Sequence, residues 1–261
     1  MGVEKDGSRA SADIPVSFLS LPSELRNRIY ALCLLHQECL DPWNDYNQRQ
    51  ELTPGLFRAN KTVHREASSL FYAQNRFDFT TTTPEDVVSF LGTIGRNNAD
   101  YIRHIYVNFP IFLCLDPGEI TLDDDSISIL ANIRSGCANL STLTTSLLST
   151  TAMEIRLDNL DNPKIATEAL KLVDTRFRAI SSLQEIIVEV YEDGSCDHIR
   201  RRMESHGWTI STTEYVEKEE ENWNGSWGTL EDEHSDFGDR GDDYDDYDID
   251  NDSDYWRRAG D

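Results

Sequence analysis

The sequence predicts a mixed α/β protein with a largely parallel sheet; a mixed α+β arrangement is the alternative. Strand-like and helix-like patterns alternate between residues 77 and 211, which is typical of βα units. Only helical patterns precede them. Residues 214–261 carry 19 acidic and four basic residues, and so charged a segment cannot offset the entropy lost on ordering. We therefore expect a flexible N-terminus at 1–17, a helical segment at 18–76, an α/β body at 77–213 and a disordered acidic tail at 214–261.

The helical segment opens at a well-marked helix start. Pro22 suits the first helical position, where its missing N–H costs nothing, and Glu24 lies near the positive end of the helix dipole. An apolar stripe follows at spacings of four, four and three residues: Leu21, Leu25, Ile29 and Leu32. This spacing places the stripe on one side of a helix over 20–35 and residues 26–28 on the other.

A second helix is predicted after a loop at 36–52. Thr53 suits its N-cap and Pro54 its first position, and the helical pattern ends near residues 74–75. Its apolar face comprises Leu56, Val63, Ala67, Leu70 and Phe71.

The body alternates between the two kinds of element. Strands are predicted at 77–80, 102–109, 143–148, 184–191 and 208–211, and helices at 84–95, 123–137, 163–180 and 198–205. Two strands follow a helix through a short turn marked by leucine, at 137–143 and 180–186, which resembles the turn of a leucine-rich repeat. The repeats lie about 26 to 44 residues apart, so we expect a short, irregular, leucine-rich-repeat-like body.

Charge and hydropathy exclude several classes of function. The formal net charge is −24, with no basic cluster to meet a phosphate backbone, so no nucleic-acid partner is expected. No apolar run is long enough to span a membrane, and residues 1–13 lack the apolar core of a signal peptide. We expect a protein of the cytoplasm or nucleus. The five cysteines contain no CxxC and are expected to be reduced.

The sequence carries no recognisable catalytic motif. The six histidines are scattered, and neither GxSxG, HExxH, GxGxxG nor a P-loop occurs. Cys196 and His198 are half of a metal site that no second pair completes. Residues 123–125 are acidic because they open a helix; cation binding is the alternative. We therefore predict a non-enzymatic protein with no cofactor and no metal.

Three interpretations of the tail remain open. The first is a solvating segment without a specific partner. Its aromatic residues, interleaved with aspartates, would alternatively grip a basic protein. These residues are Tyr244, Tyr247, Tyr255 and Trp256. Weak binding of divalent cations is the third interpretation, although the spacing does not meet the register of an EF-hand loop.

Two motifs carry a resemblance to a known family. Residues 18–30 read FLSLPSELRNRIY, and residues 56–79 read LFRANKTVHREASSLFYAQNRFDF. The first resembles the opening of an F-box, and the pair resembles a large fungal group of uncharacterised F-box-like proteins over roughly residues 18–110. The F-box resemblance implies docking on the Skp-type adaptor of a cullin–RING ubiquitin ligase. The adaptor-binding residues that it implies are Leu21, Pro22, Glu24, Leu25 and Ile29.

Three hypotheses of function follow. A substrate adaptor of a ubiquitin ligase would leave part of the apolar stripe exposed. A self-contained binding protein without a ligase link, whose body or acidic tail meets its partner, would bury the stripe against Leu56, Val63 and Leu70. An enzyme of unfamiliar type would bring charged side chains such as Glu66, Arg103 or His104 together in a pocket. The sequence leaves the oligomeric state open.

Overall fold

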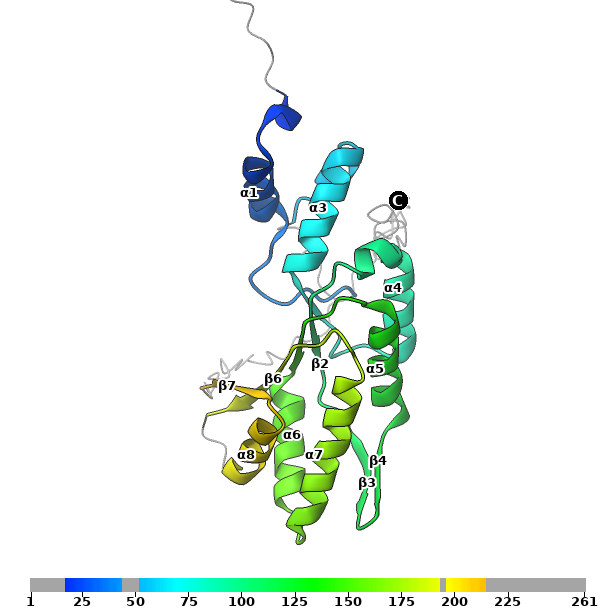
Figure 1. The fold of residues 1–261 in the computed structure, drawn as a ribbon, viewed down its shortest axis with the longest axis vertical. Helices are drawn as coiled ribbons and strands as arrows, with labels where there is room; N and C mark the ends of the chain where they lie inside the picture. The colour runs from blue at the N-terminus through cyan, green and yellow to red at the C-terminus, as the bar shows by residue number, and fades with distance from the viewer. Residues whose placement is uncertain (1–16, 44–51, 193–195, 215–261) are drawn as a thin grey trace, which may run out of the picture.

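The structure, a computed structural model, describes residues 17–43, 52–192 and 196–214. Apart from Ser17 and Glu214, the predicted flexible N-terminus and disordered tail lie outside the described residues, as do residues 44–51 of the predicted loop at 36–52. The described chain is mixed α/β, with a parallel five-stranded sheet, as the sequence predicted (Figure 1).

Short helices form the N-terminal part of the molecule. They are η1 (Phe18–Ser20), α1 (Ser23–Leu34), η2 (Pro54–Arg58) and α3 (Lys61–Gln74). The single helix predicted from Pro54 onward is therefore wrong. Asn60 interrupts it with an extended backbone, and its side-chain oxygen accepts hydrogen bonds from the N–H groups of Thr62 (2.9 Å) and Val63 (3.0 Å). This N-cap satisfies two free donors and starts a new helix.

The strands of the sheet follow one another in space as they do along the chain. The strands are β1 (Arg76–Asp78), β2 (His104–Val107), β5 (Thr142–Thr145), β6 (Glu185–Tyr191) and β7 (Thr209–Thr213). Their order is β1-β2-β5-β6-β7, and every neighbouring pair is parallel. Parallel crossovers are right-handed almost without exception, so sequential addition in one direction places the connecting helices on one face.

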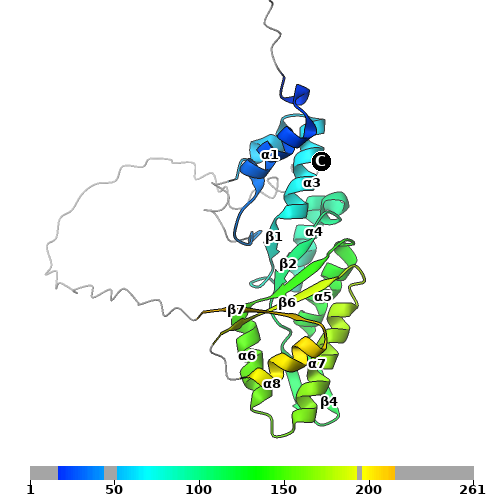
Figure 2. The same ribbon diagram turned by 60° about the vertical axis from the view of Figure 1, so that its left-hand side comes forward.

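The helices form this covering layer (Figure 2). They are α4 (Pro84–Ala99), α5 (Asp124–Gly136), α6 (Leu147–Asp158), α7 (Pro163–Arg178) and α8 (Asp197–Ser205). Within the layer α5 contacts both α4 and α7, and α8 contacts α7 and α6. Every second strand residue points into this layer, as Phe77, Ile105 and Val188 do, and all three are fully buried.

Two elements of the body were not predicted. The predicted strand at 143–148 ends at Thr145, and helix α6 follows it. The buried side of α6 includes the polar residues Thr150 and Glu154, so its sequence lacks a clear apolar helical pattern. An antiparallel hairpin, β3 (Phe112–Asp116) and β4 (Glu119–Leu122), lies between β2 and α5. Gly118 takes a positive φ in its turn, a conformation that glycine adopts without strain.

The two edges of the sheet differ. At β1, Leu40 forms a parallel bridge to Phe77. Its N–H donates to the carbonyl of Arg76 (2.7 Å), and its carbonyl accepts from the N–H of Asp78 (2.8 Å). The segment after α1 thereby joins the sheet, while β7 forms the opposite edge.

A buried ion pair fixes α8 against α6. The Nε of Arg200 donates to Glu154 (2.9 Å), and its Nη2 donates to the carbonyl of Tyr191 (2.7 Å). The Glu154 side chain is only 2% exposed. Its hydrogen bond to Arg200 raises the pKa of that guanidinium. A carboxylate this deeply buried depends on its partner for its charge to be tolerated.

The Arg200→Met variant should lose about 3–5 kcal/mol of unfolding free energy, because Glu154 would remain buried without a cation. Urea denaturation followed by tryptophan fluorescence measures this loss. Adding Glu154→Leu to the same variant should recover most of it, since both charges are then gone. An equal loss in the single and double variants would contradict the role given to this pair.

Candidate functional site

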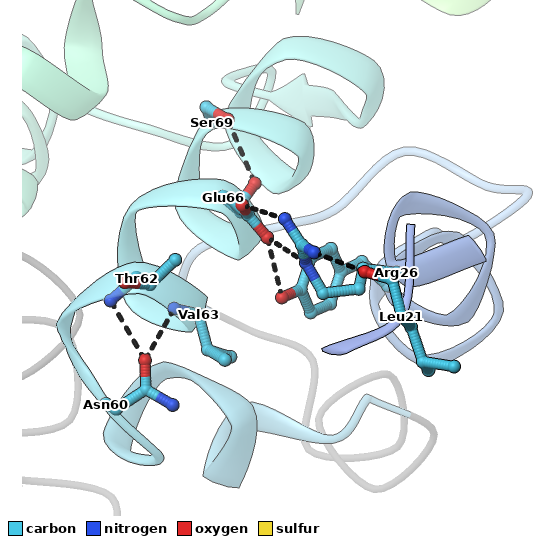
Figure 3. Close-up of polar contacts among 8 residues, drawn as sticks. Leu21, Arg26, Asn60, Thr62, Val63, Glu66 and Ser69 are labelled. Atoms are coloured by element: carbon cyan, nitrogen blue, oxygen red, sulfur yellow. Dashed lines mark hydrogen bonds and ion pairs between the residues drawn. The ribbon is translucent and has the colours of Figure 1, made fainter. Parts of the chain in front are cut away.

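Helix α1 is held on α3 by a charged anchor (Figure 3). Arg26 donates from Nε (2.8 Å) and Nη2 (2.6 Å) to the two carboxylate oxygens of Glu66, and from Nη1 to the carbonyl of Leu21 (2.6 Å). The hydroxyl of Tyr30 donates to the same carboxylate (3.0 Å). These hydrogen bonds, first the one from Arg26, lower the pKa of Glu66. A bidentate contact fixes orientation as well as distance, so it sets the rotation of α1 about its axis.

The other end of α1 has a second tie to α3. The buried Asn75 side chain donates to the carbonyls of Leu34 (2.9 Å) and Phe71 (3.0 Å), and its oxygen accepts from the N–H of His36 (2.9 Å). Asn75 thus satisfies free backbone groups at the end of both helices. With both ends fixed, Tyr30 and Leu34 become the fully buried side chains of α1.

This rotation of α1 differs from the predicted one. The buried side follows Arg26, Tyr30 and Leu34 at spacings of four residues, although Arg26 was predicted to lie on the polar side. Part of the predicted stripe points outward instead: Leu25 is 49% exposed and Leu32 is 81% exposed. Leu25 and Leu32 are therefore not buried against Leu56, Val63 and Leu70, whereas the hypothesis of a self-contained binding protein expects the whole stripe to be.

The five predicted adaptor-binding residues lie together at the start of α1. Pro22, Glu24 and Leu25 are exposed, and Leu21 and Ile29 are half-buried. Leu32 continues their apolar surface by one turn, and Leu19, 42% exposed, lies just before it in the chain. We call Leu21, Pro22, Glu24, Leu25, Ile29 and Leu32 the α1 surface.

The sheet face opposite the helices forms a second candidate surface, the open face. Its side chains lie in rows across paired strands: Arg76, His104, Thr142 and Glu185; then Asp78, Tyr106, Thr144, Ile187 and Thr209; then Glu189 and Ser211. Most of them are half-buried or exposed, whereas their neighbours along each strand are mostly buried. The sequence motifs did not predict this surface. Its rows join residues that are far apart in the sequence and come together only when the strands pair.

Two hydrogen bonds organise the open face. The hydroxyl of Tyr106 donates to Glu189 across β5. The Nε2 of His104 lies 2.8 Å from the hydroxyl of Thr144. Burial, and secondly the charge of Arg76, lowers the pKa of His104 to about 4, so the imidazole is neutral near pH 7. Burial, and secondly the bond to Glu189, raises the pKa of Tyr106.

The side chains named for an enzyme do not converge. Glu66 binds Arg26, whereas Arg103 donates to the carbonyl of Asn139 (2.9 Å) and His104 contacts Thr144. A hollow of about 250 Å³ beside Phe109 and Met153 is mainly apolar. Within the described ranges, no three His, Cys, Asp or Glu side chains form a group suited to a metal ion. None of the helices described has the length and apolar character needed to cross a membrane.

Comparison of the chain with models of protein families, with curated proteins and with solved structures gave no match.

The Glu66→Ala variant should loosen α1 without unfolding the body, because Arg26 and Tyr30 both lose their acceptor. Hydrogen exchange of the α1 amides should accelerate by at least about tenfold, since local opening needs only the local contacts to break. Mass spectrometry of peptic peptides measures this, with the α5 amides as the internal control. Faster exchange of α1 and α5 to the same extent would argue against a local anchor.

His104 should make stability depend on pH in a defined window. The pKa of an unfolded histidine is about 6.5, and that of His104 is about 4. Between these values the unfolded chain binds more protons, so stability should fall as the pH decreases through the window. The His104→Gln variant should lose less stability than the wild type between about pH 7 and pH 5. Parallel losses in urea unfolding at both pH values would refute this assignment.

Proposed function

We propose that the chain is a non-enzymatic interaction protein in which the α1 surface docks on the Skp-type adaptor of a cullin–RING ubiquitin ligase. In this proposal residues 18–76 act as an F-box-like head, and the leucine-rich-repeat-like body holds the substrate. The observation that supports it is the outward orientation of Leu25 and Leu32. Exposed large apolar side chains grouped on one surface are typical of protein-binding sites.

The Arg26–Glu66 anchor supports the proposal in a second way. A docking helix binds more tightly when its orientation is already fixed, because less entropy is lost on binding. Arg26 is a good residue for such an anchor, since its planar guanidinium binds a carboxylate through two parallel bonds. Glu24, exposed in the first turn of α1, adds a charge at the edge of the apolar surface.

The alternative is a self-contained binding protein with no ligase link, whose acidic tail contacts basic proteins. Under this alternative α1 is only a packing element of the head. The grouping of the exposed Leu25 and Leu32 with the half-buried Leu21 and Ile29 on one surface favours the adaptor proposal, because a contiguous apolar patch is more typical of an interaction site than single exposed leucines are.

The Leu25→Asp, Leu32→Asp double variant should bind the purified Skp-type adaptor at least about tenfold more weakly than the wild type, because two apolar contacts would be replaced by charges. Titration of the labelled adaptor with the full chain measures this. Leu148→Asp with Ile155→Asp on α6 is the matched control, since these residues are 74% and 54% exposed on a helix far along the chain. Failure of the wild type to bind, or an equal effect of both double variants, would refute adaptor docking.

A further inference from the structure

The open face carries more negative than positive charge. Its carboxylates are Asp78, Glu185 and Glu189, and its only described cation is Arg76. That cation is already engaged, because its Nη2 donates to the carbonyl of Gln37. His104 adds no positive charge near pH 7. The open face is therefore electrostatically complementary to a basic ligand.

Two of these carboxylates have a defined spacing on β6. Glu185 and Glu189 lie on the same side of one strand, four residues apart, which corresponds to about 13 Å at 3.3 Å per residue. Ile187 lies between them and is half-buried. The side chains beside this line are small and uncharged: Thr142 and Thr144 on β5, and Thr209 and Ser211 on β7. β6 thus presents an acid–apolar–acid row, and the Tyr106 side chain reaches its Glu189 end across β5.

We propose that the open face binds an extended segment of a partner protein that carries lysine or arginine at positions i and i+4. In an extended chain alternate side chains point the same way, so the cations at i and i+4 lie about 13 Å apart on one side. The residue at i+2 faces Ile187 and is therefore apolar. The hydroxyl groups of Thr142 on β5, and of Thr209 and Ser211 on β7, lie to either side of the segment and offer it hydrogen bonds, whereas the buried Thr144 contacts His104.

Tyr106 prepares Glu189 for this contact. Its hydroxyl donates to one carboxylate oxygen, Oε2, which holds the side chain in place across β5. In this proposal the second carboxylate oxygen of Glu189, which Tyr106 does not occupy, receives the cation. A carboxylate held in this way loses less rotational freedom when a ligand binds.

Binding of the segment to the open face does not depend on the proposed docking of α1 on an adaptor. Only the identification of that segment as part of a ligase substrate rests on the proposed function. The adaptor titration tests the α1 surface alone, and the peptide experiment below uses no adaptor. A negative result in one of the two experiments therefore does not contradict the proposal that the other tests.

The experiment measures the anisotropy of a labelled peptide with lysines at its third and seventh positions, valine between them at the fifth, and threonine elsewhere. A control peptide of identical composition has lysines at the third and sixth positions, which point to opposite sides when extended. The full chain should bind the first peptide at least about threefold more tightly than the control, because only the first pairs both cations with Glu185 and Glu189.

The protein variants locate the site. Glu185→Gln with Glu189→Gln should weaken binding of the first peptide about tenfold. Glu219→Gln with Glu220→Gln, which removes the same charge from the tail, should leave it unchanged. Ser211→Arg provides a second variant, since it places a cation beside Glu189 in the neighbouring strand, and it should also weaken binding. Unfolding curves check that each variant is folded.

Three results would overturn the proposal. They are no binding of the first peptide, equal binding of both peptides, and equal weakening by the open-face and tail variants. The last result would place the peptide on the acidic tail by general charge attraction.

Discussion

The handedness of parallel crossovers is the constraint on which the rest of this structure depends. Each strand after β1 adds on the same side of its predecessor, so right-handed connections keep the helices that join the strands on one face. That face receives the apolar half of every strand. The other half, from Arg76 to Ser211, consists mainly of polar side chains, with Ile187 among them. A sheet that reversed its strand order would place helices on both faces and would have no open face.

The anchor between Arg26 and Glu66 determines which side of helix α1 packs on α3. The apolar stripe of α1 and its Arg26–Tyr30–Leu34 side compete for the contact with α3. The Arg26–Tyr30–Leu34 side packs on α3, because it combines a bidentate ion pair, a phenol hydrogen bond and two fully buried side chains. The exposed leucines are the consequence of that choice. Polar contacts here determine which apolar residues remain available.

Much of the fold could be predicted from local patterns, and the candidate surfaces could be predicted only in part. The α/β class and five of the strands follow from alternating periods, because these depend on neighbours in the chain. Helix α6 was missed because Glu154 is buried by Arg200, a residue in a distant helix. The rotation of α1 was missed for the same reason, since Glu66 lies on another helix. The open face depends on strand pairing, which no local pattern encodes, although its members alternate visibly in EIIVEVY at 185–191.

The bridge between Leu40 and Phe77 links the order of synthesis to the order of folding. α1 and Leu40 leave the ribosome before β1, yet the hydrogen bonds of Leu40 are to the backbone of β1. Helix α1 can therefore be fixed in place only after the later residues of β1 have been synthesised. The same holds for Arg26, whose partner Glu66 lies 40 residues further along the chain. Such non-local contacts slow folding and keep early apolar residues accessible to chaperones. A chain cut after α3 would therefore lack the strand to which the Leu40 segment pairs.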